Sequence, residues 1–257
     1  MGDQAKYLYC IVRCRQDRAF SVAGMGNNGS LVRTICSKGL AAVTSDTEVK
    51  HYESTRKNMM AHEKVLESIM QEVTLLPVRF GTVVESAYPT QDIQKLLDNR
   101  AEEFDKLLND MENKEELSLK AFWRNEKVVF EEIVAESAEI RRLRSFLSDK
   151  SPEATHFERI RLGEMVKSAL GRKKAEEAGK ILPPLRQLAR AVRENEVTLD
   201  RMVVNAAFLV DKARELEFDG AVDRLDEQFG QRISFKYIGP TPPYNFVNIV
   251  VDWRDLK

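Results

Sequence analysis

The feature that most constrains this chain is the alternation of short strand-like runs with longer helical runs. The run Tyr7–Val12 is aromatic, β-branched and continuously apolar, which is typical of a strand buried on both faces. Within residues 57–72 the apolar side chains recur at steps of one, three and four positions, the spacing of one helix face. This mixture predicts an α+β fold in which small mixed sheets are packed by helices.

The length allows two such domains, because 257 residues exceed the roughly 100–200 residues of a common domain. A long amphipathic helix opening at Pro89 is followed by a polar stretch near residue 112. We therefore expect an N-terminal α+β domain over residues 1–112 and a second domain over 113–257. The second region reads as strand, long helical region, strand, helix and two strands, ending with a strand at 247–251. It predicts a ferredoxin-like domain with a helical insertion at about 127–195.

Charge and cysteine content exclude several classes of protein. The 40 Lys and Arg residues nearly balance 41 Asp and Glu residues, so no overall field attracts nucleic acid or an anionic membrane. The spacing of Cys10, Cys14 and Cys36 fits zinc poorly, and three cysteines cannot all pair with one another. No secretory signal pattern and no apolar run of about 20 residues is present. We expect a reduced, cytoplasmic protein.

Patterns that could indicate catalysis lack the context that the chemistry needs. The segment Gly24–Gly29 matches G-x-G-x-x-G, but a dinucleotide site requires it to follow a strand directly and to open a long helix. We interpret it as a flexible loop, with a phosphate cradle as the alternative. No nucleophile lies in a catalytic motif, and the three histidines are scattered. We expect no enzyme, no cofactor and no metal site.

One region of the chain is locally basic. Residues 154–195 hold ten basic and five acidic residues on mostly helical sequence that Pro183 and Pro184 interrupt. Arg141–Arg144 and Arg172–Lys174 are the best candidates for nucleic-acid contacts, although glutamates within one helical turn can pair with them. A nucleic-acid-associated protein using residues 154–195 is the main alternative function, and a lyase or transferase on a ferredoxin-like scaffold is the third.

Two features allow both a structural and an interaction role. His62 lies on or beside the apolar helix face that contains Leu66 and Ile69, so it is either a packed, hydrogen-bonded histidine or a partner-contact or catalytic residue. The segment Tyr237–Phe246 holds three prolines that stiffen a turn displaying aromatic side chains. It is interpreted as a rigid closure against the core or as a docking loop for another protein.

Four segments together resemble the gas vesicle GvpL/GvpF family, in family order and across nearly the whole chain. They are the Tyr7–Tyr9 strand with residues 39–43, the helix 59–67, the strand 76–83, and the C-terminal segment 239–246. Residues 205–210 agree as well. Two positions depart from the family pattern: Cys10 stands where Gly is common, and Thr241 replaces a Trp often found in the Pro-rich turn. The second departure weakens the idea of docking through an indole.

The resemblance implies a non-enzymatic minor structural component or assembly factor of gas vesicles, the gas-filled shells that give cells buoyancy. Its expected location is the cytoplasm and the gas vesicle, and its expected partners are the hydrophobic shell subunit and other gas vesicle proteins. Such a subunit would expose apolar surface and strand edges before assembly. We hypothesise that a groove between the two domains or a sheet edge binds it. The candidate contact positions are His62, Glu63, Arg79, Phe80, Pro240, Pro243, Tyr244 and Phe246.

Overall fold

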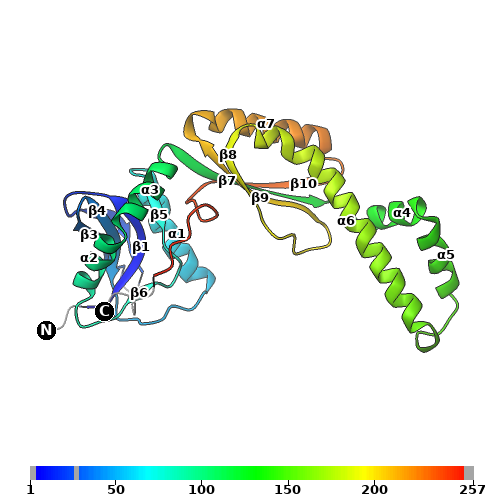
Figure 1. The fold of residues 1–257 in the computed structure, drawn as a ribbon, viewed down its shortest axis with the longest axis horizontal. Helices are drawn as coiled ribbons and strands as arrows, with labels where there is room; N and C mark the ends of the chain where they lie inside the picture. Colours follow the sequence, from blue (N-terminus) through cyan, green and yellow to red (C-terminus); the bar gives the residue numbers. More distant parts are fainter. Residues whose placement is uncertain (1–3, 26–28, 252–257) are drawn as a thin grey trace. The chain divides into compact units, whose positions relative to one another are not determined.

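The chain, described here by a computed structural model for residues 4–25 and 29–251, forms two compact units. Unit 1 combines the chain up to Glu116 with the segment from Pro240 onward, and unit 2 comprises Leu117–Gly239. Figure 1 shows the elements of each unit. This division differs from the expected second domain at 113–257, because the C-terminal segment belongs with the N-terminal residues.

Three contacts of the C-terminal segment explain the difference. Val78 forms an isolated parallel bridge with Ile249, and Arg79 Nη2 donates to Asn248 Oδ1 at 2.9 Å. Arg100 Nη1 donates to the Val250 carbonyl oxygen at 2.9 Å. The expected final strand at 247–251 is therefore only this single bridge, in which Ile249 is buried.

Unit 1 is built on an antiparallel sheet in the order β2-β3-β4-β1-β5, with β6 also paired to β1. All residues of β1 except the last are buried, which confirms the predicted doubly buried strand. The strands are β1 (Lys6–Arg13), β2 (Ala19–Ala23), β3 (Leu31–Ser37), β4 (Leu40–Asp46), β5 (Leu75–Pro77) and β6 (Val83–Val84).

The G-x-G-x-x-G segment connects β2 to β3, two strands that the sequence did not predict. Gly26–Asn28 lie outside the described residues, while Gly24 N–H donates to the Ser30 carbonyl at 2.8 Å. A Cβ on Gly24 would lie 2.8 Å from that same oxygen, so the close approach of the two strands requires glycine. Because a strand follows the segment, the strand-to-helix context of a dinucleotide site is absent there.

Three helices pack on the sheet of unit 1: α1 (Arg56–Met70), α2 (Pro89–Asn99) and α3 (Ala101–Met111). Figure 1 shows α1 on one side of this sheet and α2 with α3 on the other. Helix α1 buries Val65, Leu66 and Ile69, as its periodicity predicts, and the Thr55 hydroxyl caps it by accepting from Asn58 N–H at 3.3 Å. The single helix predicted from Pro89 is divided at Arg100.

Unit 2 has the βαββαβ order of a ferredoxin-like domain, which confirms the predicted fold, although the expected element order (strand, helical region, strand, helix and two strands) was wrong. Its sheet follows the order β10-β7-β9-β8, with α6 between β7 and β8 and α7 between β9 and β10. The bounds are β7 (Lys114–Trp123), α6 (His156–Arg186), β8 (Ala189–Glu194), β9 (Met202–Asp211), α7 (Glu215–Phe229) and β10 (Ile233–Thr241).

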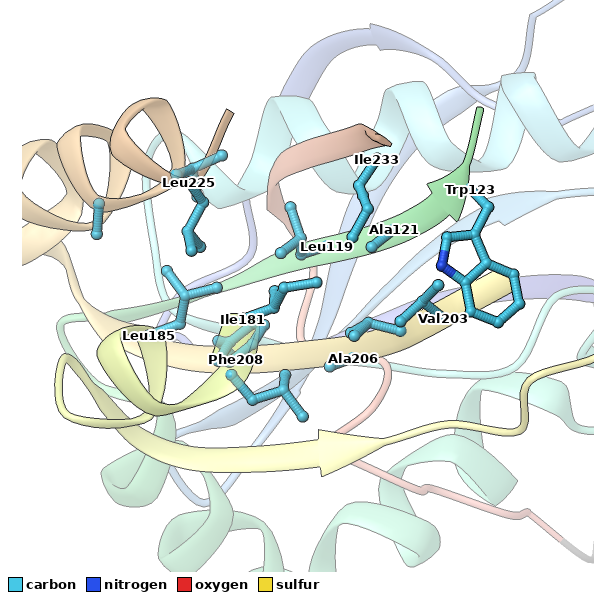
Figure 2. Close-up of a cluster of buried hydrophobic side chains, with 14 of the residues drawn as sticks. Leu119, Ala121, Trp123, Ile181, Leu185, Val203, Ala206, Phe208, Leu225 and Ile233 are labelled. Carbon is cyan, nitrogen blue, oxygen red and sulfur yellow. The ribbon is translucent and has the colours of Figure 1, made fainter. Parts of the chain in front are cut away.

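The core of unit 2 lies between this sheet and the two helices (Figure 2). The strands contribute alternate side chains and the helices contribute one face each, so burial of these groups fixes the layer packing. The labelled members are Leu119, Ala121 and Trp123 of β7, Val203, Ala206 and Phe208 of β9, Ile181 and Leu185 of α6, Leu225 of α7 and Ile233 of β10.

The predicted helical insertion is a helical arm of α4 (Glu126–Glu136), α5 (Ala138–Leu147) and the short 3-10 turn η1 (Glu153–Thr155), packed along the first half of α6 (Figure 1). The expected bounds of 127–195 are too long, because residues 189–194 pair with β9 as the edge strand β8. Pro183 and Pro184 do not interrupt α6, since both lie in its last turns. Among the described helices, none is long and apolar enough to cross a membrane.

Candidate protein-interaction site

His62 is a packed residue of the unit 1 core. It is 2% exposed, its Nδ1 lies 3.0 Å from the Tyr7 hydroxyl, and its ring stacks on Tyr9 and meets Phe80 edge-on. The Tyr7 hydroxyl also accepts from Gly81 N–H at 2.9 Å, so donation from Tyr7 to Nδ1 leaves the histidine proton on Nε2. Burial lowers the pKa of His62 to about 4, which keeps the ring neutral near pH 7.

Glu63, the next residue on α1, connects this core to the Pro-rich turn. The Tyr244 hydroxyl donates to Glu63 Oε2 at 2.7 Å. Burial raises the pKa of the Glu63 carboxyl, and the bond from Tyr244 opposes part of that rise. Burial and the neighbouring Glu63 carboxylate raise the pKa of Tyr244. The pair therefore links a carboxylate and a neutral phenol within unit 1.

A second carboxyl group holds the turn from the other side. Glu116 accepts from Asn245 N–H at 2.8 Å and from Asn245 Nδ2 at 2.6 Å. Burial raises the pKa of Glu116, while these two donors lower it. Backbone bonds within the turn, from Phe246 and Val247 N–H to the Pro243 carbonyl, fix its shape. The Pro-rich segment is thus closed rigidly against unit 1.

Unit 1 brings together five of the eight candidate positions predicted from the sequence. His62, Glu63, Phe80 and Tyr244 share the contacts above, and Arg79 precedes Phe80 and bonds Asn248. The other three serve the turn itself: Pro243 is buried and accepts backbone bonds, Phe246 is half-buried, and Pro240 is exposed near the end of β10. A contact between these eight residues and a partner stays a prediction.

Beside Glu63, three side chains with apolar surface remain exposed. Met59 is 51% exposed, Met60 60% and Tyr244 39%. Met60 and Met59 precede Glu63 by three and four positions, so both are its neighbours on the helix surface. Tyr244 joins them through its bond to Glu63. We call Met59, Met60 and Tyr244 the Met–Tyr patch.

The sequence reasoning did not select the two methionines or the tyrosine partners of His62. Both methionines lie in the helix segment that carries the family resemblance, and the position of Met60 off the Val65–Leu66–Ile69 face was a usable signal. Met59 lies seven positions before Leu66, so spacing alone places it beside that face, and only the structure shows it exposed. Tyr7 and Tyr9 alternate on one face of β1, but only the folded structure places them against His62.

Half of the ten basic residues in the region 154–195 form ion pairs with neighbouring carboxylates. Of the candidate runs Arg141–Arg144 and Arg172–Lys174, only Lys173 is among these five residues, so the nucleic-acid alternative stays a prediction. The pairs are Arg161 with Glu139, Lys173 with Glu132 and Glu136, Lys180 with Glu176, Arg186 with Glu194, and Arg190 with Asp211. Within residues 4–25 and 29–251, no group of three or more His, Cys, Asp or Glu side chains could hold a metal ion.

Comparisons with known proteins agree over nearly the full length. Residues 5–248 match the family model described as gas vesicle synthesis protein GvpL/GvpF. Gas vesicle protein F of Nostoc sp. (strain PCC 7120) is 30% identical over 233 residues, covering 89% of this chain and 93% of the relative. Gas vesicle protein F of Streptomyces sp. (strain CB03234) is also 30% identical, covering 94% and 98% respectively.

Solved structures show the same fold. The crystal structure of GvpF from Anabaena sp. PCC7120 has a TM-score of 0.79 and 28% identity, covering 97% of this chain and all of that chain. The crystal structure of GvpF from Microcystis aeruginosa has a TM-score of 0.80 and 26% identity, covering 95% and 99% respectively. With two α+β units, a matching family model and relatives of this similarity, the chain belongs to the gas vesicle GvpL/GvpF family.

Proposed function

We propose that this protein is a minor structural component or assembly factor of gas vesicles that binds the hydrophobic shell subunit during vesicle formation. Family membership supports a role connected with gas vesicles. The observation that carries the binding proposal is the Met–Tyr patch, since exposed apolar side chains grouped on one face mark contact sites. Other gas vesicle proteins are the alternative partners for the same surface.

The chemistry of the patch suits an apolar partner of variable shape. Methionine side chains are flexible and polarisable, and they adapt to irregular apolar surfaces. Tyr244 is held by Glu63 and by its rigid turn, so it offers a fixed aromatic surface at little entropic cost. The fixed ring of Tyr244 beside the flexible side chains of Met59 and Met60 could therefore cover an exposed apolar surface of the shell subunit without a deep pocket.

The sheet edge β8, one alternative location, is less suited to strand addition. Its side chains include Arg190, which pairs with Asp211, and the exposed Arg193. Charged side chains on an edge strand oppose pairing with another strand. The interdomain groove that the sequence suggests stays a prediction.

Co-expression with the major shell subunit tests the proposal. We expect the full chain to retain the subunit in the soluble fraction at low and at high salt, because apolar contacts resist screening. The double variant Met59→Glu/Met60→Glu should lose most of that retention. Leu216→Glu is the matched control, since Leu216 is 85% exposed on a helix far along the sequence from the patch.

The possible outcomes test the location of the binding site and the identity of the partner separately. If the double variant retains the subunit as well as the unaltered chain does, the Met–Tyr patch is rejected as the contact. If the unaltered chain retains no subunit, the shell subunit is rejected as the partner. Pull-down with the other gas vesicle proteins then decides between the remaining partners.

A further inference from the structure

A groove on the helical arm of unit 2 combines an apolar lining with positive charge. It lies between α5 and α6 and has a volume of about 590 Å³. The apolar lining comes from Leu147, Leu162 and Val166. Two arginines, Arg144 and Arg159, complete much of the wall, and the described lining contains no carboxylate.

Gly163 lines the groove with bare backbone. A Cβ built on this residue would meet no atom within 4 Å, so the space over α6 at this point is open. Ile160, three positions earlier on the same helix, is 47% exposed and extends the apolar surface beside the groove. An exposed apolar recess of this kind is suited to an inserted side chain.

The two arginines lack acidic partners of their own. Arg159 is fixed by neutral acceptors: its Nε donates to Thr155 Oγ1 at 3.1 Å and its Nη2 to the carbonyl oxygens of Leu147 and Lys150, at 3.4 and 3.1 Å. Arg144 is exposed and makes no hydrogen bond or ion pair with the described residues. Nearby Glu139 is engaged by Arg161. The groove therefore presents two guanidinium charges that no carboxylate neutralises.

We propose that the α5–α6 groove binds an acidic amphipathic helix of a partner protein. Apolar anchors spaced three and four residues apart would enter the recess over Gly163, as in other helix-in-groove complexes. Carboxylates on the flanks of that helix would pair with the guanidinium of Arg144 in a bidentate manner and with Arg159 through its remaining Nη1–H donors. This groove is separate from the Met–Tyr patch, and its binding does not depend on the proposed contact with the shell subunit.

The test measures fluorescence anisotropy of two labelled synthetic helical peptides with the full chain. Both carry leucines at positions i, i+3, i+4 and i+7; one has glutamates on the remaining surface and the other lysines. We expect saturable binding of the glutamate peptide that weakens as salt is raised, and much weaker binding of the lysine peptide.

Two variants and a matched control locate the binding. Gly163→Leu fills the recess and Arg144→Glu reverses one charge, and each should weaken the glutamate peptide about tenfold or more. Gly171→Leu is the control, because a Cβ at Gly171 also meets nothing within 4 Å but lies outside the groove. Leucine is a better helix former than glycine, so both leucine variants should fold. The control should bind within about twofold of the unaltered chain.

Several results would overturn the proposal. Equal binding of the two peptides, or glutamate-peptide binding that Gly163→Leu leaves unchanged, would show that the groove does not select this partner. If the chain sediments with phosphatidylglycerol vesicles and Gly163→Leu abolishes this co-sedimentation, the groove binds lipid instead. Concentration-dependent self-association of the chain that the same variant abolishes would assign the groove to a second copy.

Discussion

The two units fasten their helices to their sheets by different chemistry. In unit 1, α1 is tied to β1 by neutral groups: His62 bonds the Tyr7 hydroxyl and stacks on Tyr9, whose hydroxyl bonds Ser45 Oγ at 2.8 Å. In unit 2, charged groups tie the helical arm to the sheet. Arg232, just before β10, donates to both Glu132 of α4 and Glu177 of α6, at 2.7–2.9 Å.

The difference predicts separate sensitivities to pH and salt. A neutral buried histidine opposes protonation, so unit 1 should weaken in mild acid. The bonds from Arg232 lower the pKa of Glu132 to about 2, so this carboxylate stays charged in the same pH range. The ion pairs of unit 2 are partly exposed and should weaken with salt, which has little effect on the neutral contacts of unit 1.

Mild acid should give the largest effect. The pKa of His62 is about 4 in the folded chain, against 6.5 for a solvated histidine such as that of the unfolded chain. Between these two pH values the unfolded chain binds more protons than the folded chain, so the free energy of unfolding decreases as the pH falls. The histidine contribution lost between pH 7 and 4.5 is roughly 2.5 kcal/mol. Glu63 and Glu116, whose pKa values burial raises, offset part of this loss. Amide hydrogen exchange of β1 and α1, corrected for the pH dependence of the intrinsic exchange rates, measures the net loss of stability.

His62→Phe isolates the histidine, because it removes the titrating group while Glu63 and Glu116 remain. We expect this variant to lose most of the pH dependence in β1 and α1. His156→Gln is the control, since His156 is exposed at the start of α6 and should leave the dependence unchanged. An unaltered pH profile in His62→Phe would assign the acid sensitivity to other groups.

Removal of Arg232 should give the second effect, in unit 2. Arg232→Met keeps the apolar stem but leaves Glu132 and Glu177 without the guanidinium, at a cost of about 2 kcal/mol. Hydrogen exchange should increase in α4 and in the middle of α6, while β1 and α1 stay protected. In 1 M NaCl the difference from the unaltered chain should shrink. A salt-independent difference would mean that Arg232 acts mainly through packing.

The smallest effect should come from the link between α1 and the Pro-rich turn. Tyr244→Phe removes the hydroxyl that donates to Glu63 and should cost about 1 kcal/mol. Limited chymotrypsin cleavage after Phe246, which is the same in all the chains compared, should become faster because the segment would detach more often from unit 1. Tyr88→Phe, at an exposed tyrosine of the same unit, is the control. Equal cleavage rates in all three chains would show that the bond does not hold the segment.

The local sequence pattern was sufficient to predict elements whose burial follows from their own residues. The strand β1 was predicted from its continuous apolar run and the buried face of α1 from its helical period. The ferredoxin-like fold of unit 2 was predicted too, although the expected order of its elements was wrong. Strands β2, β3 and β8 were missed: β2 has five residues, β3 directly follows the glycine-rich segment, and β8 alternates only weakly with charged side chains. Their pairing partners, rather than their own residues, make them strands.

The candidate site was predicted in part for the same reason. The position of His62 beside an apolar helix face follows from spacing alone, and the Pro-rich turn is visible as composition. Their meeting through Glu63 and Tyr244 joins residues 181 positions apart in the sequence. No local period encodes such a contact. The arm groove is lined by residues of both α5 and α6, including Gly163, so it exists only when the two helices lie side by side.

The return of the C-terminal segment to unit 1 sets an order for folding on the ribosome. Unit 2, residues 117–239, is synthesised entirely between the two parts of unit 1. Ribosomes add roughly 5–20 residues per second, so synthesis of unit 2 takes roughly 6–25 seconds. Only after that time is the C-terminal segment available to pair with Val78 and Arg79 of unit 1. During synthesis, unit 2 should therefore complete its folding before unit 1. Loss of residues 240–251 would disturb the unit whose other residues are synthesised first.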